Sequence, residues 1–186
     1  MDKETVQETL RNATLEPYQL GLAFRSSMIP PDRQQCVSRA AGPLRFEVEV
    51  RHLDDRAVAT SRGEEMSSNS KQIFDDYGAT LHVFGATDGI EHLRFDCFAK
   101  KPHYHYAQES GNVNLVCRLD QYAEGDPVEW TIDRLRCRLP EMLEHCRAFD
   151  LAQLVRDRSN EILAVIDEVA ELLREAQKRA TAVHAV

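Results

Sequence analysis

Residues 77–99, YGATLHVFGATDGIEHLRFDCFA, hold two runs rich in β-branched and aromatic residues, separated by a segment rich in Gly, Thr and Asp. This pattern predicts a β-hairpin. Apolar and polar residues alternate along its second run, with Leu93, Phe95 and Cys97 on one side and His92, Arg94 and Asp96 on the other. Successive side chains of a strand point to opposite faces, so the hairpin belongs to a sheet with one apolar and one polar face.

Two registers of this hairpin are open. In the first, His82 lies opposite His92, and both share the polar face with Arg94 and Asp96. In the second, Asp88 and Gly89 form a two-residue turn, and His82 faces Phe95 instead. The first register gathers a histidine cluster and the second disperses it.

The period of two continues on both sides of the hairpin. RFEVEVRHL, residues 45–53, predicts a strand, and a turn at Asp54 and Asp55 is expected to return the chain through residues 56–60. After the hairpin, further strands are expected at 103–107 and 112–120. With strands near 80–85 and 90–99, these form an antiparallel meander.

Helical signals begin at Asp126. An N-cap aspartate, Pro127 at the first helical position and Glu129 three residues after the cap predict a helix start. Apolar residues at helical spacing follow and cross Pro140, which predicts a kink or two consecutive helices. A further helical region with a wide apolar stripe is expected from Asp150 onward.

Strands followed by helices indicate the α+β class, with an antiparallel β-meander packed by C-terminal helices. The expected organisation is one domain overall. An N-terminal helix and irregular segment is expected at 1–43, the antiparallel sheet at 44–125, and the helices that pack on the sheet at 126–186. The C-terminal helices are apolar enough for a homodimer to form through them.

Composition narrows the function classes. The chain has 186 residues and a formal net charge of −8, which argues against nucleic-acid binding through phosphate contacts. No apolar run is long enough for a transmembrane helix and no signal peptide is recognisable, so we expect a cytoplasmic protein without a membrane partner. The five cysteines form no CxxC pair and are expected to be reduced.

Chemistry is expected near KPHYHYAQE, residues 101–109. His103 and His105 project from the same face of a strand, and Glu109 can reach the same ion, so these residues are candidate ligands of a divalent transition metal. The spacing HxHxxxE resembles the first half of the cupin metal motif. The elements Arg94-Phe95-Asp96 and Pro102-His103-Tyr104-His105 resemble TumE-type toxin components of bacterial toxin–antitoxin pairs.

Two functions are expected as alternatives. In the first, the polar face binds a small molecule or anion, with or without a metal. His103, His105 and Asp96 are then the candidate catalytic residues, and the candidate ligand-binding residues are Arg94, Arg118, His92, Tyr104 and Tyr106. In the second, the protein is a noncatalytic homodimeric or partner-binding protein that associates through its C-terminal helices, of which a toxin–antitoxin component is one example, and its polar face holds only structural ion pairs. Whether the protein is an enzyme is left open.

Overall fold

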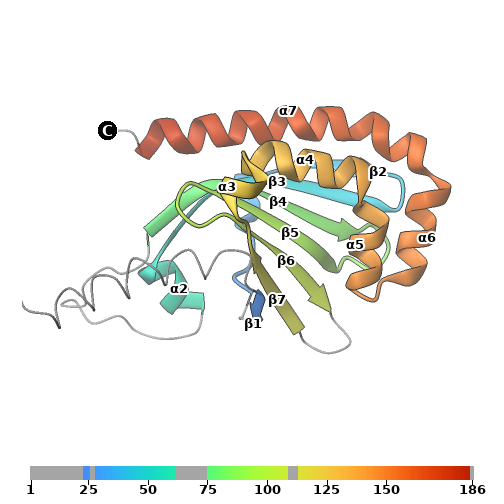
Figure 1. Ribbon diagram of the computed structural model, residues 1–186, viewed down its shortest axis with the longest axis horizontal. Coiled ribbons are helices and arrows are strands. Elements are labelled where there is room, and N and C mark those ends of the chain that lie inside the picture. The colour runs from blue at the N-terminus through green and yellow to red at the C-terminus, as the bar shows by residue number, and fades with distance from the viewer. Residues whose placement is uncertain (1–22, 26–27, 62–74, 109–112, 185–186) are drawn as a thin grey trace, which may run out of the picture.

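The computed structural model of the protein describes residues 23–25, 28–61, 75–108 and 113–184 (Figure 1). Its centre is a seven-stranded antiparallel sheet in the order β1-β7-β6-β5-β4-β3-β2. The strands are β1 (Ala23–Arg25), β2 (Cys36–Ala41), β3 (Leu44–Asp54), β4 (Asp75–Gly85), β5 (Glu91–Phe98), β6 (His103–Gln108) and β7 (Val113–Arg118). The predicted α+β class with an antiparallel meander is confirmed.

The helices follow the sheet, with the exception of α2. They are α2 (Asp55–Ser61), α3 (Gln121–Glu124), α4 (Pro127–Cys137), α5 (Leu139–His145), α6 (Phe149–Asp157) and α7 (Ser159–His184), and a 3-10 turn, η2 (Arg33–Gln35), precedes β2. Figure 1 shows α7 running along the sheet with α4 beside it. The core lies between these helices and the sheet; among its members are Phe46, Leu81, Val83, Phe95, Ile132, Leu135, Ile166 and Leu173.

The helix boundaries follow the predicted signals. Asp126 caps α4, because its carboxylate accepts hydrogen bonds from the backbone N–H groups of Val128 and Glu129. Helix α4 ends at Cys137 and α5 begins at Leu139, with Pro140 in its first turn. Pro140 therefore separates two consecutive helices, one of the two outcomes expected from the sequence. Among the described residues, no helix is both long and apolar enough to cross a bilayer.

Two expectations about the chain before the hairpin are wrong. Residues 56–60 do not return as a strand: they lie in α2, whose start is stabilised by the 2.7 Å hydrogen bond from the N–H of Ala57 to Oδ1 of Asp54. The first 43 residues are also not confined to a helix and irregular chain, since β1 and β2 form the two edges of the sheet. The expected helix near the N-terminus lies outside the described residues.

The hairpin adopts neither of the two predicted registers. His82 lies opposite Arg94 and Thr80 lies opposite Asp96, with an irregularity between Val83 and Phe84. Asp88 and Gly89 are part of a longer loop, closed by a hydrogen bond from the N–H of Gly85 to the carbonyl of Ile90. This register places His82, Arg94 and Asp96 on one face, while His92 falls at the irregularity.

Candidate functional site

The face of the sheet turned away from α4 and α7 is polar across five strands. Two rows of directly opposed residues cross it: Glu49, Thr80, Asp96, His103 and Arg118 form one row, and Glu47, His82, Arg94 and His105 form the other. Most of these residues are buried. Buried polar groups are costly unless they are hydrogen-bonded, so these rows must satisfy one another.

Asp96, His103 and His105 form the tightest cluster on this face. Nε2 of His105 lies 2.9 Å from Oδ2 of Asp96, and Nε2 of His103 lies 3.2 Å from the same oxygen. The other carboxylate oxygen, Oδ1, accepts a 2.6 Å hydrogen bond from the hydroxyl of Thr80. One atom of each of the three cluster residues lies within 4.8 Å of the others, which is close enough to surround a metal ion.

The outer nitrogens of both imidazoles are held by oxygen atoms. Nδ1 of His103 lies 2.7 Å from the carbonyl of Lys101, and Nδ1 of His105 lies 2.9 Å from Oδ1 of Asn114. A carbonyl oxygen only accepts hydrogen bonds, so each Nδ1 carries the proton. Each Nε2 then presents either a lone pair or a second proton to Asp96. Metal-bound histidines are typically oriented by the same kind of outer hydrogen bond.

Electrostatics differ between the two histidines. Burial raises the pKa of Asp96, but hydrogen bonds from both imidazoles outweigh burial and hold that pKa well below its usual range. Burial lowers the pKa of His103, yet the hydrogen bond and charge of Asp96 raise it above its ordinary value. For His105 burial prevails and the pKa is lowered. The field of Asp96 therefore favours a proton on His103 more than on His105.

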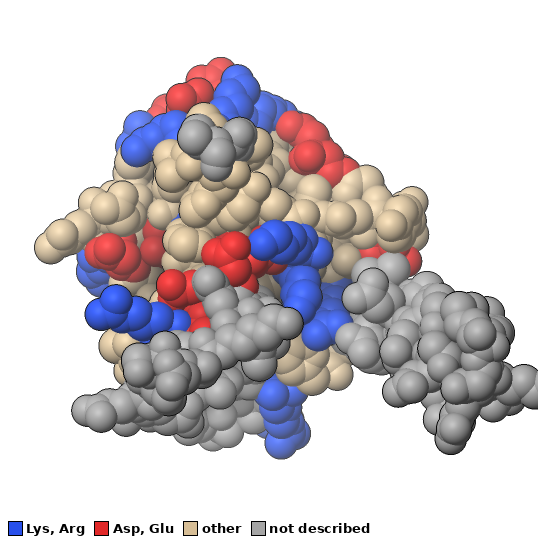
Figure 2. Space-filling model, turned by 90° about the vertical axis from the view of Figure 1, so that its left-hand side faces the viewer, with Lys and Arg blue, Asp and Glu red and all other residues tan. Residues whose placement is uncertain are grey.

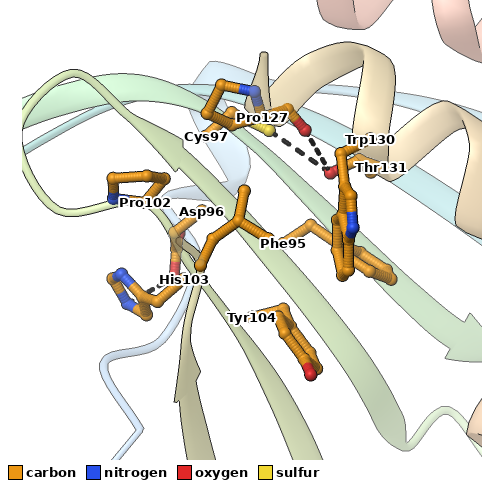
Figure 3. A pocket seen from close by; sticks show the side chains of 10 residues that line it. Phe95, Asp96, Cys97, Pro102, His103, Tyr104, Pro127, Trp130 and Thr131 are labelled. Atoms are coloured by element: carbon orange, nitrogen blue, oxygen red, sulfur yellow. Dashed lines mark hydrogen bonds and ion pairs between the residues drawn. The ribbon is translucent and has the colours of Figure 1, made fainter. Parts of the chain in front are cut away.

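Access to this cluster is from the side of His103. The side chain of His103 is 17% exposed, whereas Asp96 is 3% and His105 is 7% exposed. A cavity of about 10 Å³ lies between this end of β5 and β6 and the start of α4. Figure 3 shows His103 turned toward Asp96 on one side of this cavity, and Tyr104 and Trp130 on the other side. This cavity is large enough for about one water molecule and no more. A larger ligand must approach from the exposed edge of His103.

Tyr104 and Tyr106 lie on the opposite face from the histidines. Tyr104 packs against Trp130 with ring centroids 5.0 Å apart, and Tyr106 packs against His145 at 4.4 Å. Alternation along β6 requires this arrangement, because His103 and His105 occupy the other side. The expectation that these tyrosines share a ligand site with the histidines is therefore wrong.

The remaining predicted residues are spread around the cluster. His92 contacts Asp88 at 3.1 Å, and the guanidinium of Arg118 lies over the ring of Phe24 at 5.4 Å. Arg94 binds both oxygens of Glu91 at 2.7 Å each. Glu109, the third metal ligand expected from the sequence, lies outside the described residues. Asp96, expected to orient a histidine, contacts both His103 and His105.

A second polar cluster surrounds His82, which is fully buried. Its Nε2 lies 2.9 Å from Glu49 and its Nδ1 lies 2.7 Å from Glu91. Both ring nitrogens of His82 therefore face carboxylate oxygens, which only accept hydrogen bonds. Cys36, Glu49 and His82 are also close enough to hold a metal. However, Arg51 lies 3.3 Å from Glu49, and burial raises the pKa of the Cys36 thiol to about 11. This cluster is therefore the poorer metal site.

Sequence reasoning missed the partners that complete both clusters. Thr80 and Asn114 lie at polar positions of their strands, and alternation alone places them on this face. Thr80 reaches Asp96 through the register of β4 with β5, and Asn114 reaches His105 through the register of β6 with β7. Glu49 and Glu91 look like surface residues in the alternating pattern, yet both contact the buried ring of His82, and Glu49 is itself buried.

The end of the molecule near the start of β4 carries basic and acidic side chains next to one another (Figure 2). Lys100 Nζ lies 3.2 Å from a carboxylate oxygen of Asp75, and His52 lies 2.7 Å from the other. Asp76, which is buried, accepts hydrogen bonds from the backbone N–H groups of Lys100 and Lys101. These contacts fix the connection that leads into His103.

Comparison with known proteins gives one relationship. No match was found among curated proteins or among solved structures. A family model described as "Domain of unknown function (DUF7700)" matches residues 39–173. This range includes most of the sheet, all three residues of the Asp96 cluster and most of α7. The chain therefore belongs to the DUF7700 family.

Proposed function

We propose that this protein binds a divalent transition-metal ion through Asp96, His103 and His105, and presents that ion to a small molecule. The observation that carries the proposal is the convergence of both Nε2 atoms on one carboxylate oxygen, at 2.9 and 3.2 Å. Both Nδ1 atoms are engaged by oxygen atoms on the outer side. A metal ion between these groups would accept all the inward-facing lone pairs.

The donor set narrows the choice of metal. Two imidazoles and one carboxylate suit zinc or iron(II), and they leave coordination positions for water and a further ligand. A bound ion of this kind lowers the pKa of a coordinated water or polarises a carbonyl group. Within the chain, Thr80 would orient the carboxylate, while Lys101 and Asn114 would orient the imidazoles. The partly exposed edge of His103 would be the entry side.

Metal analysis of protein purified without a histidine tag tests the proposal. The wild type is expected to hold a stoichiometric divalent metal after incubation with zinc or iron(II) and removal of excess ion. The double variant His103→Ala/His105→Ala and the isosteric variant Asp96→Asn are expected to lose it. His52→Ala is a matched control, because His52 pairs with Asp75 at the exposed end of the sheet.

Circular dichroism should first establish that every variant is folded. Retention of the metal by Asp96→Asn and by the double histidine variant would contradict the proposal. So would a wild-type protein that fails to bind zinc, iron(II), manganese or nickel under any of the incubation conditions.

A second candidate function is self-association through the C-terminal helices, with a second copy of the chain as partner. Its support is the exposure of apolar side chains there: Phe149 is 62%, Leu154 is 44% and Leu163 is 42% exposed. Light scattering should give a dimer mass for the wild type and a monomer mass for Leu154→Lys/Leu163→Lys. Val183→Lys, at the far end of α7, is the control. A monomeric wild type at high concentration would exclude this function.

A further inference from the structure

Residues 28–35, called the strap below, lie against the polar face and are bound there by charged side chains. Two arginines converge on one backbone carbonyl of the strap. Nη2 of Arg51 donates to the carbonyl of Ile29 at 2.9 Å and to that of Pro30 at 3.1 Å. Nη1 of Arg94 donates to the same carbonyl of Ile29 at 2.7 Å. A neutral oxygen thus occupies the meeting point of two guanidinium groups.

Two guanidinium groups supply more positive charge and more hydrogen-bond donors than a neutral carbonyl oxygen requires. Arg51 is 3% and Arg94 is 2% exposed, so both charges are withdrawn from water. Nε of Arg51 is also buried and has no hydrogen-bond acceptor among the described residues. Guanidinium groups bind carboxylates in a forked geometry more strongly than they bind neutral carbonyls. A carboxylate at this point would accept from both arginines.

Each arginine keeps a donor for a further acceptor beside its acidic partner. Arg51 lies 3.3 Å from Glu49, and Arg94 is paired with both oxygens of Glu91. Nη2 of Arg51 and Nη1 of Arg94 are directed instead at the strap. Two further acids of this face, Glu47 and Asp96, have partners of their own.

The strap is suited to occupy this point reversibly. Pro30 and Pro31 have no N–H group, so this part of the strap cannot add a full strand ladder to the sheet. Its carbonyls remain available as acceptors, and its contacts with the sheet are made to charged side chains. Asp32 donates from its backbone N–H to Glu49 at 3.2 Å, and Arg33 donates to Glu47 at 3.3 Å. A ligand that supplies better acceptors could displace it.

The geometry points to a carboxylate-binding site at Arg51 and Arg94, at the point where both arginines contact the backbone carbonyls of Ile29 and Pro30. The ligand class is a small carboxylic acid. Arg94 precedes Asp96 by two residues on the same face of β5, so the Cα atoms of these two residues lie about 7 Å apart. A short carboxylate could thus reach from the arginines toward the metal. The site rests on its own contacts and does not require a bound metal.

Calorimetric titration of the 186-residue chain, treated with chelator and free of metal, tests this site. The probes are acetate, succinate and inorganic phosphate. We expect saturable binding of a carboxylate probe to the wild type. The variant Pro30→Gly/Pro31→Gly should bind it about tenfold more tightly, because a less rigid strap is displaced at lower cost. Its arginines are unchanged, so tighter binding also shows that the variant is folded.

The matched comparison is made within this glycine background. Arg51→Lys and Arg94→Lys keep the charge but lose the forked geometry, and each should weaken carboxylate binding about tenfold. Arg39→Lys, on an exposed pair with Glu168, should leave it unchanged. No binding to the wild type and glycine variant, equal affinity with lysine at 51 and 94, or binding of phosphate alone would overturn the assignment. Because metal is absent throughout, none of these outcomes bears on the Asp96 cluster.

Discussion

At the residue scale, the proposed metal site depends on which ring nitrogen of each histidine carries the proton. The carbonyl of Lys101 fixes the proton of His103 on Nδ1, and Asn114 does the same for His105 through its side-chain oxygen. The inward nitrogens are therefore available to a metal. Two histidines on the same face of a strand do not by themselves make a metal site. An imidazole protonated on Nε2 and not on Nδ1 would present an N–H group to the ion where a lone pair is needed.

The role of Asn114 as the partner of His105 can be tested directly. Asn114→Ala removes the acceptor for Nδ1 and should lower zinc affinity about 10- to 100-fold, because the ring is no longer held in its ligating orientation. Competition titration with a chromophoric chelator measures the change. Asn160→Ala, at the exposed start of α7, should leave zinc affinity unaltered. Equal affinities for the two variants would argue against an orienting role.

Glu91 links the polar face to acid stability. Burial raises its pKa, but hydrogen bonds from His82 and Arg94 outweigh burial and lower the pKa from 4.5 to about 2. A carboxyl group whose pKa is lower in the folded than in the unfolded protein stabilises the fold at pH values above its unfolded pKa. This contribution is lost as pH falls from about 4.5 toward 2. The shift corresponds to roughly 3 kcal/mol.

Denaturant unfolding of wild type and Glu91→Gln as a function of pH measures this linkage. The wild type should be the more stable protein at pH 7, and the difference should shrink as pH falls below about 4. Both proteins should be studied without metal. A stability difference that stays constant from pH 7 to pH 3 would show that Glu91 contributes by packing and not by its charge.

At the scale of elements, the apolar periodicities were the most informative part of the sequence. They predicted the sheet face formed by Leu93, Phe95 and Cys97, while the capping signals at Asp126 and Pro127 predicted the helix start. The return strand at residues 56–60 was wrong because a side-chain cap from Asp54 favours a helix there. The register of the hairpin could not be predicted, because it depends on the conformation of the whole loop and on an irregularity beside Val83.

Helix α7 is predicted to stabilise the sheet without taking part in the chemistry. Leu173 is fully buried in the core, and Leu173→Ala should lower the free energy of unfolding by about 2–5 kcal/mol. Leu163→Ala, on the exposed side of the same helix, should change it by less than about 0.5 kcal/mol. The folded fraction of each variant should still bind metal stoichiometrically; loss of metal from folded Leu173→Ala would contradict this separation of roles.

Considered as a whole, the molecule is a sheet whose two faces differ in kind. Helices α4 and α7 cover the apolar face, while the polar face carries the Asp96 cluster and the arginine pair under the strap. The sequence predicted that the sheet has a polar face and that His103 and His105 lie on the same face of one strand. It could not predict the strap, because residues 28–35 are held by side-chain contacts between segments far apart in the chain.

Anomalous diffraction from crystals soaked in zinc, recorded at the zinc absorption edge, tests the metal centre most directly. The predicted result is a strong peak about 2 Å from Nε2 of His103, Nε2 of His105 and a carboxylate oxygen of Asp96. Zinc bound only elsewhere, with Asp96 still in direct hydrogen-bond contact with both imidazoles, would contradict the account.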